Sequence, residues 1–213
     1  MSDRTSPNST HPGPAPVKEG AGAWLFRHRT ALPLPIALAI LAVPAGNPRG
    51  GTALPAAGLV LIVTGEAVRL WGVRHIGAVS RTRSERLGPL VDSGPFAWVR
   101  NPLYIGNVFL WVGFALAARL WWLAPIVFLL LALEYHAIVG WEERLLVERI
   151  GDVYRSYTDR VPRWLPRVRR ATPSPSRAAA AAAFSWTETL FSERGTLIAI
   201  GLGYLLLWIK ARF

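Results

Sequence analysis

Long apolar stretches recur along this chain of 213 residues and are separated by polar or basic segments. A helix needs about 20 apolar residues to cross the bilayer core, and about 17 is the minimum. Five stretches approach that length: residues 31–45, 52–73, 103–118, 121–141 and 195–209. Three prolines in the first stretch predict a short or bent helix there. The pattern predicts an all-α integral membrane protein with four to five transmembrane helices.

The third and fourth stretches are separated only by Arg119 and Leu120, which predicts a tight antiparallel hairpin. A hairpin returns the chain to the same membrane face, so we expect Arg100 and Glu142 to lie close together. The helix dipole disfavours the adjacent carboxylates Glu142 and Glu143 at the end of the second arm. A cationic or donor-rich ligand would compensate them, and we therefore expect a polar pocket at this end of the hairpin.

The remaining segments predict a simple domain plan. Residues 1–23 are rich in Pro, Ser, Thr and Gly and are interpreted as a disordered leader, followed by a membrane domain over 24–170. Residues 171–184 form a Pro/Ser/Ala linker, and 185–213 are expected to contain a C-terminal helix. This helix is either an additional span or an interfacial helix. The absence of charge over 195–209 favours a span, although a span would place two terminal basic residues outside.

Composition and charge are consistent with a membrane protein. Hydrophobic residues make up 52% of the chain, yet the net charge is +11. If the amino terminus is cytoplasmic, 20 of the 24 Lys and Arg residues fall on the inner segments 1–30, 69–102 and 142–194. This asymmetry follows the positive-inside rule and predicts that the polar pocket faces the cytoplasm. The richness in Ala, Arg, Gly and Pro is typical of a high-GC bacterial genome, so we expect a bacterial inner-membrane protein. Nucleic-acid binding is disfavoured, because it expects basic residues on a soluble, polar surface.

Ionisable residues inside predicted spans are candidates for function. Glu66 and Arg69 lie three positions apart and can neutralise each other on one helical face. Glu134 and His136 lie two apart, so they point to different faces and do not form a simple acid–base pair. Glu134 needs a partner in lipid and is a candidate substrate-binding residue. The chain has no Cys, which excludes disulfides and thiolate metal sites, and we expect no metal.

Two segments that flank the hairpin carry the most informative motifs. The first is GPFAWVRNPLYIGN, residues 94–107, and the second is EERLLVERIGDVYRSYTDRVPRWLP, residues 142–166. In the second, the helix is expected to continue to Gly151, and Tyr154 and Tyr157 should share one face of a further short helix. From spacing alone, an amphipathic interfacial helix explains this second segment equally well.

Taken together, these motifs resemble the isoprenylcysteine carboxyl methyltransferase family, which is related to the phospholipid N-methyltransferases. The family pattern is Gly-Pro-aromatic, Arg-His-Pro-x-Tyr-x-Gly, a two-helix hairpin, Glu-Glu-x-x-Leu, a Gly, two Tyr three apart, Pro-Arg and a closing Pro. Here it reads Gly94-Pro95-Phe96, Arg100-Asn101-Pro102-Leu103-Tyr104-Ile105-Gly106, Glu142-Glu143-Arg144-Leu145-Leu146, Gly151, Tyr154, Tyr157, Pro162-Arg163 and Pro166. The family His is replaced by Asn101, which can form hydrogen bonds but cannot act as a base at neutral pH.

The resemblance implies an S-adenosylmethionine-dependent membrane enzyme that methylates a lipophilic substrate reached from the bilayer. It implies a cofactor site lined by Arg100, Asn101, Pro102, Leu103, Tyr104, Gly106, Glu142 and Glu143. We expect Arg100 and Arg163 to be the catalytic residues, since arginine suits bidentate carboxylate binding. The substrate is expected to contact Tyr154, Tyr157, Arg163 and Glu134.

Arginines outnumber candidate bases here, which favours a carboxylate acceptor over a protonated amine, because a carboxylate needs no general base. Two alternatives remain open. Sterol reductases have a similar C-terminal hairpin, so an intramembrane NADPH-dependent reductase is one. The other is a non-catalytic membrane scaffold that has lost the family His.

Overall fold

The computed structural model describes residues 20–45, 51–77, 90–166 and 185–212. Every regular element in these ranges is a helix, which confirms the predicted all-α class. The helices are α1 (Ala21–His28), α2 (Leu34–Ala42), α3 (Ala53–Ile76), the 3₁₀ helix η2 (Gly94–Ala97), α4 (Pro102–Ala117), α5 (Leu123–Ile150), α6 (Asp152–Arg160) and α7 (Trp186–Lys210).

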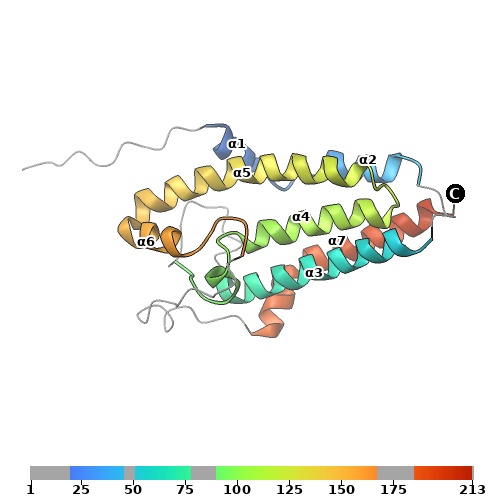
Figure 1. The fold of residues 1–213 in the computed structure, drawn as a ribbon. Coiled ribbons are helices and arrows are strands. Elements are labelled where there is room, and N and C mark those ends of the chain that lie inside the picture. Colours follow the sequence, from blue (N-terminus) through green and yellow to red (C-terminus); the bar gives the residue numbers. More distant parts are fainter. Residues whose placement is uncertain (1–19, 46–50, 78–89, 167–184, 213) are drawn as a thin grey trace, which may run out of the picture.

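Four long helices, α3, α4, α5 and α7, run side by side along one direction (Figure 1). Of these, α3, α5 and α7 are long and apolar enough to cross a membrane, and α4 is a shorter apolar helix. The first predicted stretch forms only the nine-residue α2, which is about 14 Å long. The prolines of this stretch explain why it is short, as expected. Helix α1 packs against α5, and α2 contacts α4 and α7 (Figure 1).

Helices α3 and α4 are in backbone contact because glycines face each other. On α3, Gly58 and Gly65 are seven residues apart, and on α4 the same spacing separates Gly106 and Gly113. A Cβ atom on Gly65 would lie 2.7 Å from the Gly106 carbonyl oxygen, and one on Gly58 would lie 2.6 Å from that of Gly113. Small residues allow membrane helices to approach this closely. This glycine spacing was not among the predicted features.

The predicted hairpin of α4 and α5 is confirmed. Arg119 adopts a left-handed conformation with φ of 62°, which reverses the chain between the two helices. Leu120, next to it, is 1% exposed and belongs to the apolar core that α2, α4 and α5 share. The hairpin therefore brings the start of α4 and the end of α5 to one end of the molecule (Figure 1).

Helix α7 begins at Trp186, nine residues before the predicted apolar run. A capping box explains this start: the Ser185 hydroxyl accepts from the Glu188 backbone, and the Ser185 N–H donates to the Glu188 carboxylate at 2.8 Å. At its other end the Lys210 ammonium donates to the Ile40 carbonyl at 2.5 Å. Helix α7 therefore packs along α3 and reaches the end of the bundle that holds α2 (Figure 1).

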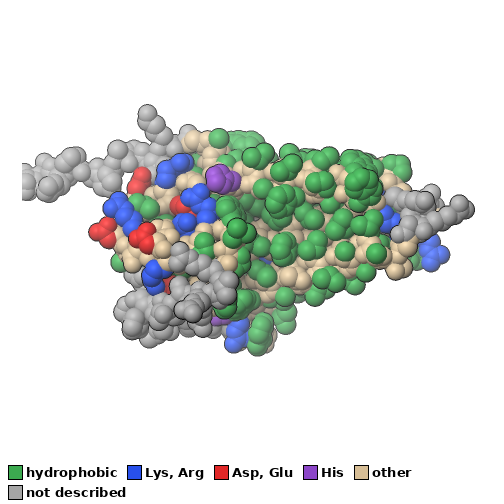
Figure 2. Space-filling view, in the orientation of Figure 1, with side chains coloured by type: hydrophobic (Ala, Val, Ile, Leu, Met, Phe, Trp, Pro, Cys, Tyr) green, Lys and Arg blue, Asp and Glu red, His purple; other side chains and the backbone are tan. Residues whose placement is uncertain are grey.

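The predicted leader and linker lie mostly outside the described residues. The structure describes nothing before residue 20 or over 167–184, and the predicted end of the leader at residue 23 falls within α1. In the described part, apolar side chains cover the long helices, whereas charged side chains gather at the end that holds α6 (Figure 2). This distribution is typical of a membrane protein with one polar end.

Candidate functional site

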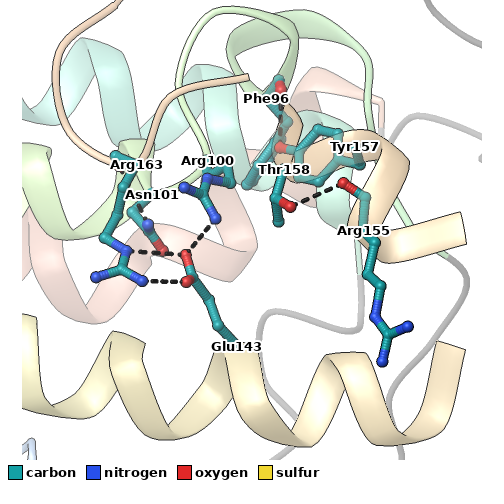
Figure 3. A network of polar contacts seen from close by, with 8 residues as sticks. All are labelled: Phe96, Arg100, Asn101, Glu143, Arg155, Tyr157, Thr158 and Arg163. Atoms are coloured by element: carbon teal, nitrogen blue, oxygen red, sulfur yellow. Dashed lines mark hydrogen bonds and ion pairs between the residues drawn. The ribbon is translucent and has the colours of Figure 1, made fainter. Parts of the chain in front are cut away.

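The two motif segments meet at this polar end. The Arg100 backbone N–H donates to the Pro162 carbonyl at 2.9 Å, and the Asn101 side-chain amide donates to the Arg163 carbonyl at 3.1 Å. The Tyr157 hydroxyl donates to the Phe96 carbonyl at 2.8 Å (Figure 3). These three hydrogen bonds fasten the segment before α4 to α6 and to the segment that follows it, which agrees with the predicted hairpin.

Two glycines shape this end of the molecule. Gly94 has a φ of 58°, and its missing side chain leaves room for the ring of His75 from α3. Gly151 has a φ of 65° and ends α5, so that α6 can turn back toward α4. The predicted continuation of the helix to Gly151 and the following short helix are both confirmed.

Glu143 is the centre of an ion-pair cluster. Its carboxylate accepts from Arg100 Nη1 at 2.8 Å and from Arg163 Nε at 3.1 Å, and its second oxygen binds Arg163 Nη2 (Figure 3). The Glu143 and Arg100 side chains are 13% and 14% exposed, whereas Arg163 is 32% exposed. We call these three residues the Glu143 cluster. Two guanidinium groups and one carboxylate give it a surplus positive charge.

Glu142 has a different environment from its neighbour. Its carboxylate accepts from the Tyr104 hydroxyl at 3.1 Å, and the positive charge of Arg29 acts on it from the segment after α1. Arg100 was expected to lie close to Glu142, and the carboxylate that it contacts is that of the adjacent residue, Glu143. Successive helical residues are about 100° apart around the axis, and this rotation directs only Glu143 toward the two arginines.

Tyr154 and Tyr157 share the buried face of α6, as predicted. Each is 3% exposed, and their ring centroids are 5.9 Å apart. Burial raises the pKa of both phenols above the usual value; Glu143 raises that of Tyr154 further, and Arg100 partly offsets it. Both phenols are therefore neutral at physiological pH, and the Tyr157 hydroxyl is already engaged by the Phe96 carbonyl.

Three of the residues expected to line a cofactor site face α3 instead of the Glu143 cluster. Pro102 is buried, and Leu103 packs onto Gly72, where a Cβ atom would lie 2.7 Å from Leu103 Cδ2. Gly106 lies against Gly65 and the aliphatic part of Arg69. Tyr104 points the other way, toward Glu142, because it is two residues from Gly106 on the same helix.

Glu134, the remaining predicted substrate residue, lies on α5 two turns before Glu142. It is half-buried, and its Oε1 atom is buried without a hydrogen-bond partner among the described residues. His136 is exposed on another face. The structure therefore separates Glu134 from Glu143 by nine residues, which is about 13.5 Å along the helix axis.

The predicted pair of Glu66 and Arg69 is part of a larger cluster. Arg69 Nε lies 3.6 Å from Glu66, and Nη2 donates to Glu193 at 2.5 Å and to Thr196 at 3.1 Å, both on α7. Arg69 Nη1 donates to Asn107 on α4. We call this group the Arg69 cluster. Sequence reasoning missed Asn107, Glu193 and Thr196, since no local pattern indicates which helices become neighbours.

Metal binding has no support in the described residues. They contain no group of three or more His, Cys, Asp or Glu side chains that could hold a metal ion. The polar atoms at the hairpin end instead offer carboxylates and guanidinium groups, which suit an organic ligand with separate positive and negative charges.

Comparison with known proteins supports the resemblance found from the motifs. The model of the phospholipid methyltransferase family matches residues 54–152. Protein-S-isoprenylcysteine O-methyltransferases of Rattus norvegicus and Mus musculus are each 29% identical over 126 residues, which cover 55% of this chain and 43% of each enzyme. The chain thus spans less than half the length of these two relatives.

A bacterial relative matches a longer part of the chain. The nickel-cobalt-cadmium resistance protein NccN of Alcaligenes xylosoxydans xylosoxydans is 27% identical over 152 residues, 68% of either chain. No solved structure matches. The family model and the two protein-S-isoprenylcysteine O-methyltransferases agree with the family resemblance found from the motifs.

Proposed function

We propose that this protein is an S-adenosylmethionine-dependent methyltransferase of the membrane that acts on a lipophilic substrate. One observation carries the proposal: two adjacent carboxylates at the hairpin end have opposite surroundings. Glu143 is bound by two arginines, whereas Glu142 accepts a hydrogen bond from the Tyr104 hydroxyl. A positive and a negative binding position therefore lie side by side on consecutive residues.

The residues present fit the amino-acid part of this cofactor. Its ammonium group needs a carboxylate, and Glu142 contacts the neutral Tyr104 hydroxyl rather than an arginine among the described residues. Its carboxylate group needs donors, and Arg100 Nε is a buried donor without a hydrogen-bond partner in the described structure. We assign the ammonium to Glu142 and the carboxylate to Arg100, with Asn101 and Tyr104 fixing the two sides of the site.

When bound, the cofactor supplies an electrophilic methyl group on its sulfonium. The contribution of this chain is orientation and exclusion of water, which are the main requirements of an in-line displacement. Arg163 is the most exposed member of the Glu143 cluster, so it is the residue that we place nearest the methyl acceptor. Tyr154 and Tyr157 are buried together with Val161, two residues before Arg163, and so hold this segment in place.

The surplus positive charge of the Glu143 cluster favours a carboxylate acceptor. A carboxylate is already nucleophilic and is attracted to a guanidinium group, whereas a protonated amine must first lose a proton to a base. Asn101 occupies the position of the family His and donates its amide hydrogen to the Arg163 carbonyl, which is a positioning contact. We therefore propose O-methylation of a lipophilic carboxylate, reached laterally from the bilayer.

The distribution of basic residues supports a cytoplasmic position for this site. Charged side chains gather at the end that holds α6 (Figure 2), and the inner segments inferred from the sequence carry most of the Lys and Arg residues. We therefore propose an inner-membrane protein whose hairpin end faces the cytoplasm, where S-adenosylmethionine is available.

Calorimetric titration of the purified protein with S-adenosylhomocysteine tests the proposal. We expect binding by the wild type and a loss of about 10- to 100-fold in affinity in Glu142→Gln, because a charge-assisted contact is removed. Glu148→Gln is the matched control, since Glu148 is exposed on the same helix. No binding by the wild type, or equal affinity in Glu142→Gln, would refute the assignment.

A further inference from the structure

The Arg69 cluster is connected to the candidate site by a continuous series of contacts. Asn107 accepts from Arg69 Nη1, and its side chain also interacts with the Tyr135 side chain on α5. The Tyr135 ring packs on that of Tyr104, with centroids 4.7 Å apart. The Tyr104 hydroxyl then donates to Glu142. The series begins on α3, passes through α4 and α5, and ends at Glu142, the carboxylate to which we assign the ammonium group of the cofactor.

Helix α7 holds the far end of this series. Its Glu193 and Thr196 both accept from Arg69 Nη2, at 2.5 Å and 3.1 Å. Glu193 is 7% exposed, and the Arg69 side chain is 14% exposed, so few competing water contacts are available to either. These acceptors fix the guanidinium group, since its planar donors can satisfy α7 and Asn107 together only in one orientation.

The glycine at position 106 makes this geometry possible. A Cβ atom there would lie 2.6 Å from Arg69 Cγ, so the side chain of Arg69 crosses α4 directly over Gly106. Arg69 thereby reaches Asn107, the next residue on α4, from the α3 side, while Tyr104 lies on the α5 side. Gly106 thus leaves the space through which the Arg69 side chain reaches Asn107.

We propose that Arg69, anchored by α7, is a positioning residue that orients Glu142 for the cofactor through Asn107, Tyr135 and Tyr104. The inference rests on the proposed function. It assigns a role in the site to helix α7, which lies beyond the residues that the family model matches, 54–152. Without the Arg69 contact, Asn107 can rotate, and the Tyr135 and Tyr104 rings lose the support that holds the Tyr104 hydroxyl on Glu142.

A double-mutant cycle between Asn107→Ala and Tyr104→Phe tests the connection. The two readouts are affinity for S-adenosylhomocysteine and the melting temperature of the full-length protein in detergent. We expect Asn107→Ala to weaken binding about 3- to 10-fold in the wild-type background, a range typical of coupling through neighbours. In the Tyr104→Phe background the same change should alter affinity less than about twofold, because the last contact is already absent.

Loss of packing alone gives a different result. A merely structural role for Asn107 predicts the same loss of affinity in both backgrounds, in proportion to the fall in melting temperature, and this outcome overturns the proposal. Glu193→Gln provides a milder second variant, which keeps an oxygen for Arg69 and should weaken binding less than Asn107→Ala.

Arg194→Gln is the control on α7, since Arg194 is exposed and lies over Phe191. It should leave affinity unchanged, and an equal loss in Arg194→Gln and Glu193→Gln also overturns the proposal. If the wild type binds and Glu142→Gln weakens binding while Asn107→Ala does not, the proposed function stands and the positioning role of Arg69 fails. No binding by the wild type refutes both.

Discussion

The Glu143 cluster and the Arg69 cluster have opposite compositions. In the first, one carboxylate lies between two arginines, and in the second, one arginine lies between the carboxylates Glu66 and Glu193. The first contains Arg163, which is 32% exposed, whereas the Glu66, Arg69 and Glu193 side chains are at most 14% exposed. The two clusters thus differ in their access to solvent. The partly exposed Glu143 cluster can receive a ligand, whereas the buried Arg69 cluster joins helices.

The largest effect that we predict comes from a substitution that disrupts the Glu143 cluster. Glu143→Gln leaves Arg100 and Arg163 facing each other without a counter-charge, which should cost about 3 kcal/mol of unfolding free energy. The melting temperature should fall by roughly 6–12 °C for a chain of this length. Thermal unfolding in detergent measures it, with Glu148→Gln as the exposed control on α5. An unchanged melting temperature would show that the two arginines do not depend on Glu143.

A smaller effect is expected from overpacking beside the Arg69 cluster. Gly106→Ala places a Cβ atom 2.6 Å from Arg69 Cγ and 2.7 Å from the Gly65 carbonyl oxygen, and only the first of these neighbours can move easily. Overpacking of this kind costs about 2 kcal/mol. Gly140→Ala is the matched control, because a Cβ atom at that helical position meets nothing within 4 Å and should stabilise α5 slightly. Equal melting temperatures for the two variants would contradict the tight α3–α4 contact.

The third prediction tests the role of Asn101 beside the Glu143 cluster. Asn101→Ala removes the hydrogen bond to the Arg163 carbonyl and should cost about 1 kcal/mol of unfolding free energy. Asn101→His can donate from a ring nitrogen, so we expect it to recover most of that stability. Melting temperatures test this order. A new rise in methyl-transfer rate above the histidine pKa in Asn101→His would instead indicate that this position takes part in proton transfer.

The hairpin end could be predicted from sequence because its signals are local. The two-residue break at Arg119 and Leu120, the terminal Gly151 and the spacing of Tyr154 and Tyr157 each depend on a few neighbouring residues, and the structure confirms all three features. The sequence could not predict whether Glu142 or Glu143 contacts Arg100. The outcome depends on how α5 is rotated about its axis relative to the loop that carries Arg100. A change of one residue position rotates the side chain by about 100°.

The Arg69 cluster shows a second limit of sequence reasoning. The pair of Glu66 and Arg69 follows from helical spacing, but Glu193 is far away in the sequence and comes from a helix whose docking no motif indicates. The glycines that bring α3 and α4 together were visible at seven-residue intervals, such as Gly58 and Gly65. They indicate a close helix contact without naming the partner, which only the assembled bundle supplies.

The smallest effect that we predict is a gain in stability and comes from a substitution in the Arg69 cluster. Glu66 has both carboxylate oxygens buried without a hydrogen bond among the described residues, and Arg69 already binds Glu193 at 2.5 Å. Glu66 therefore adds a surplus negative charge to a site with little access to water, and Glu66→Gln should stabilise the protein by up to about 1 kcal/mol. Glu193→Gln should not, because it removes the carboxylate that Arg69 binds. Thermal unfolding of the two variants decides the matter: if Glu66→Gln lowers the melting temperature as much as Glu143→Gln does, Glu66 is a required partner of Arg69, and the two clusters are alike in their dependence on every charge.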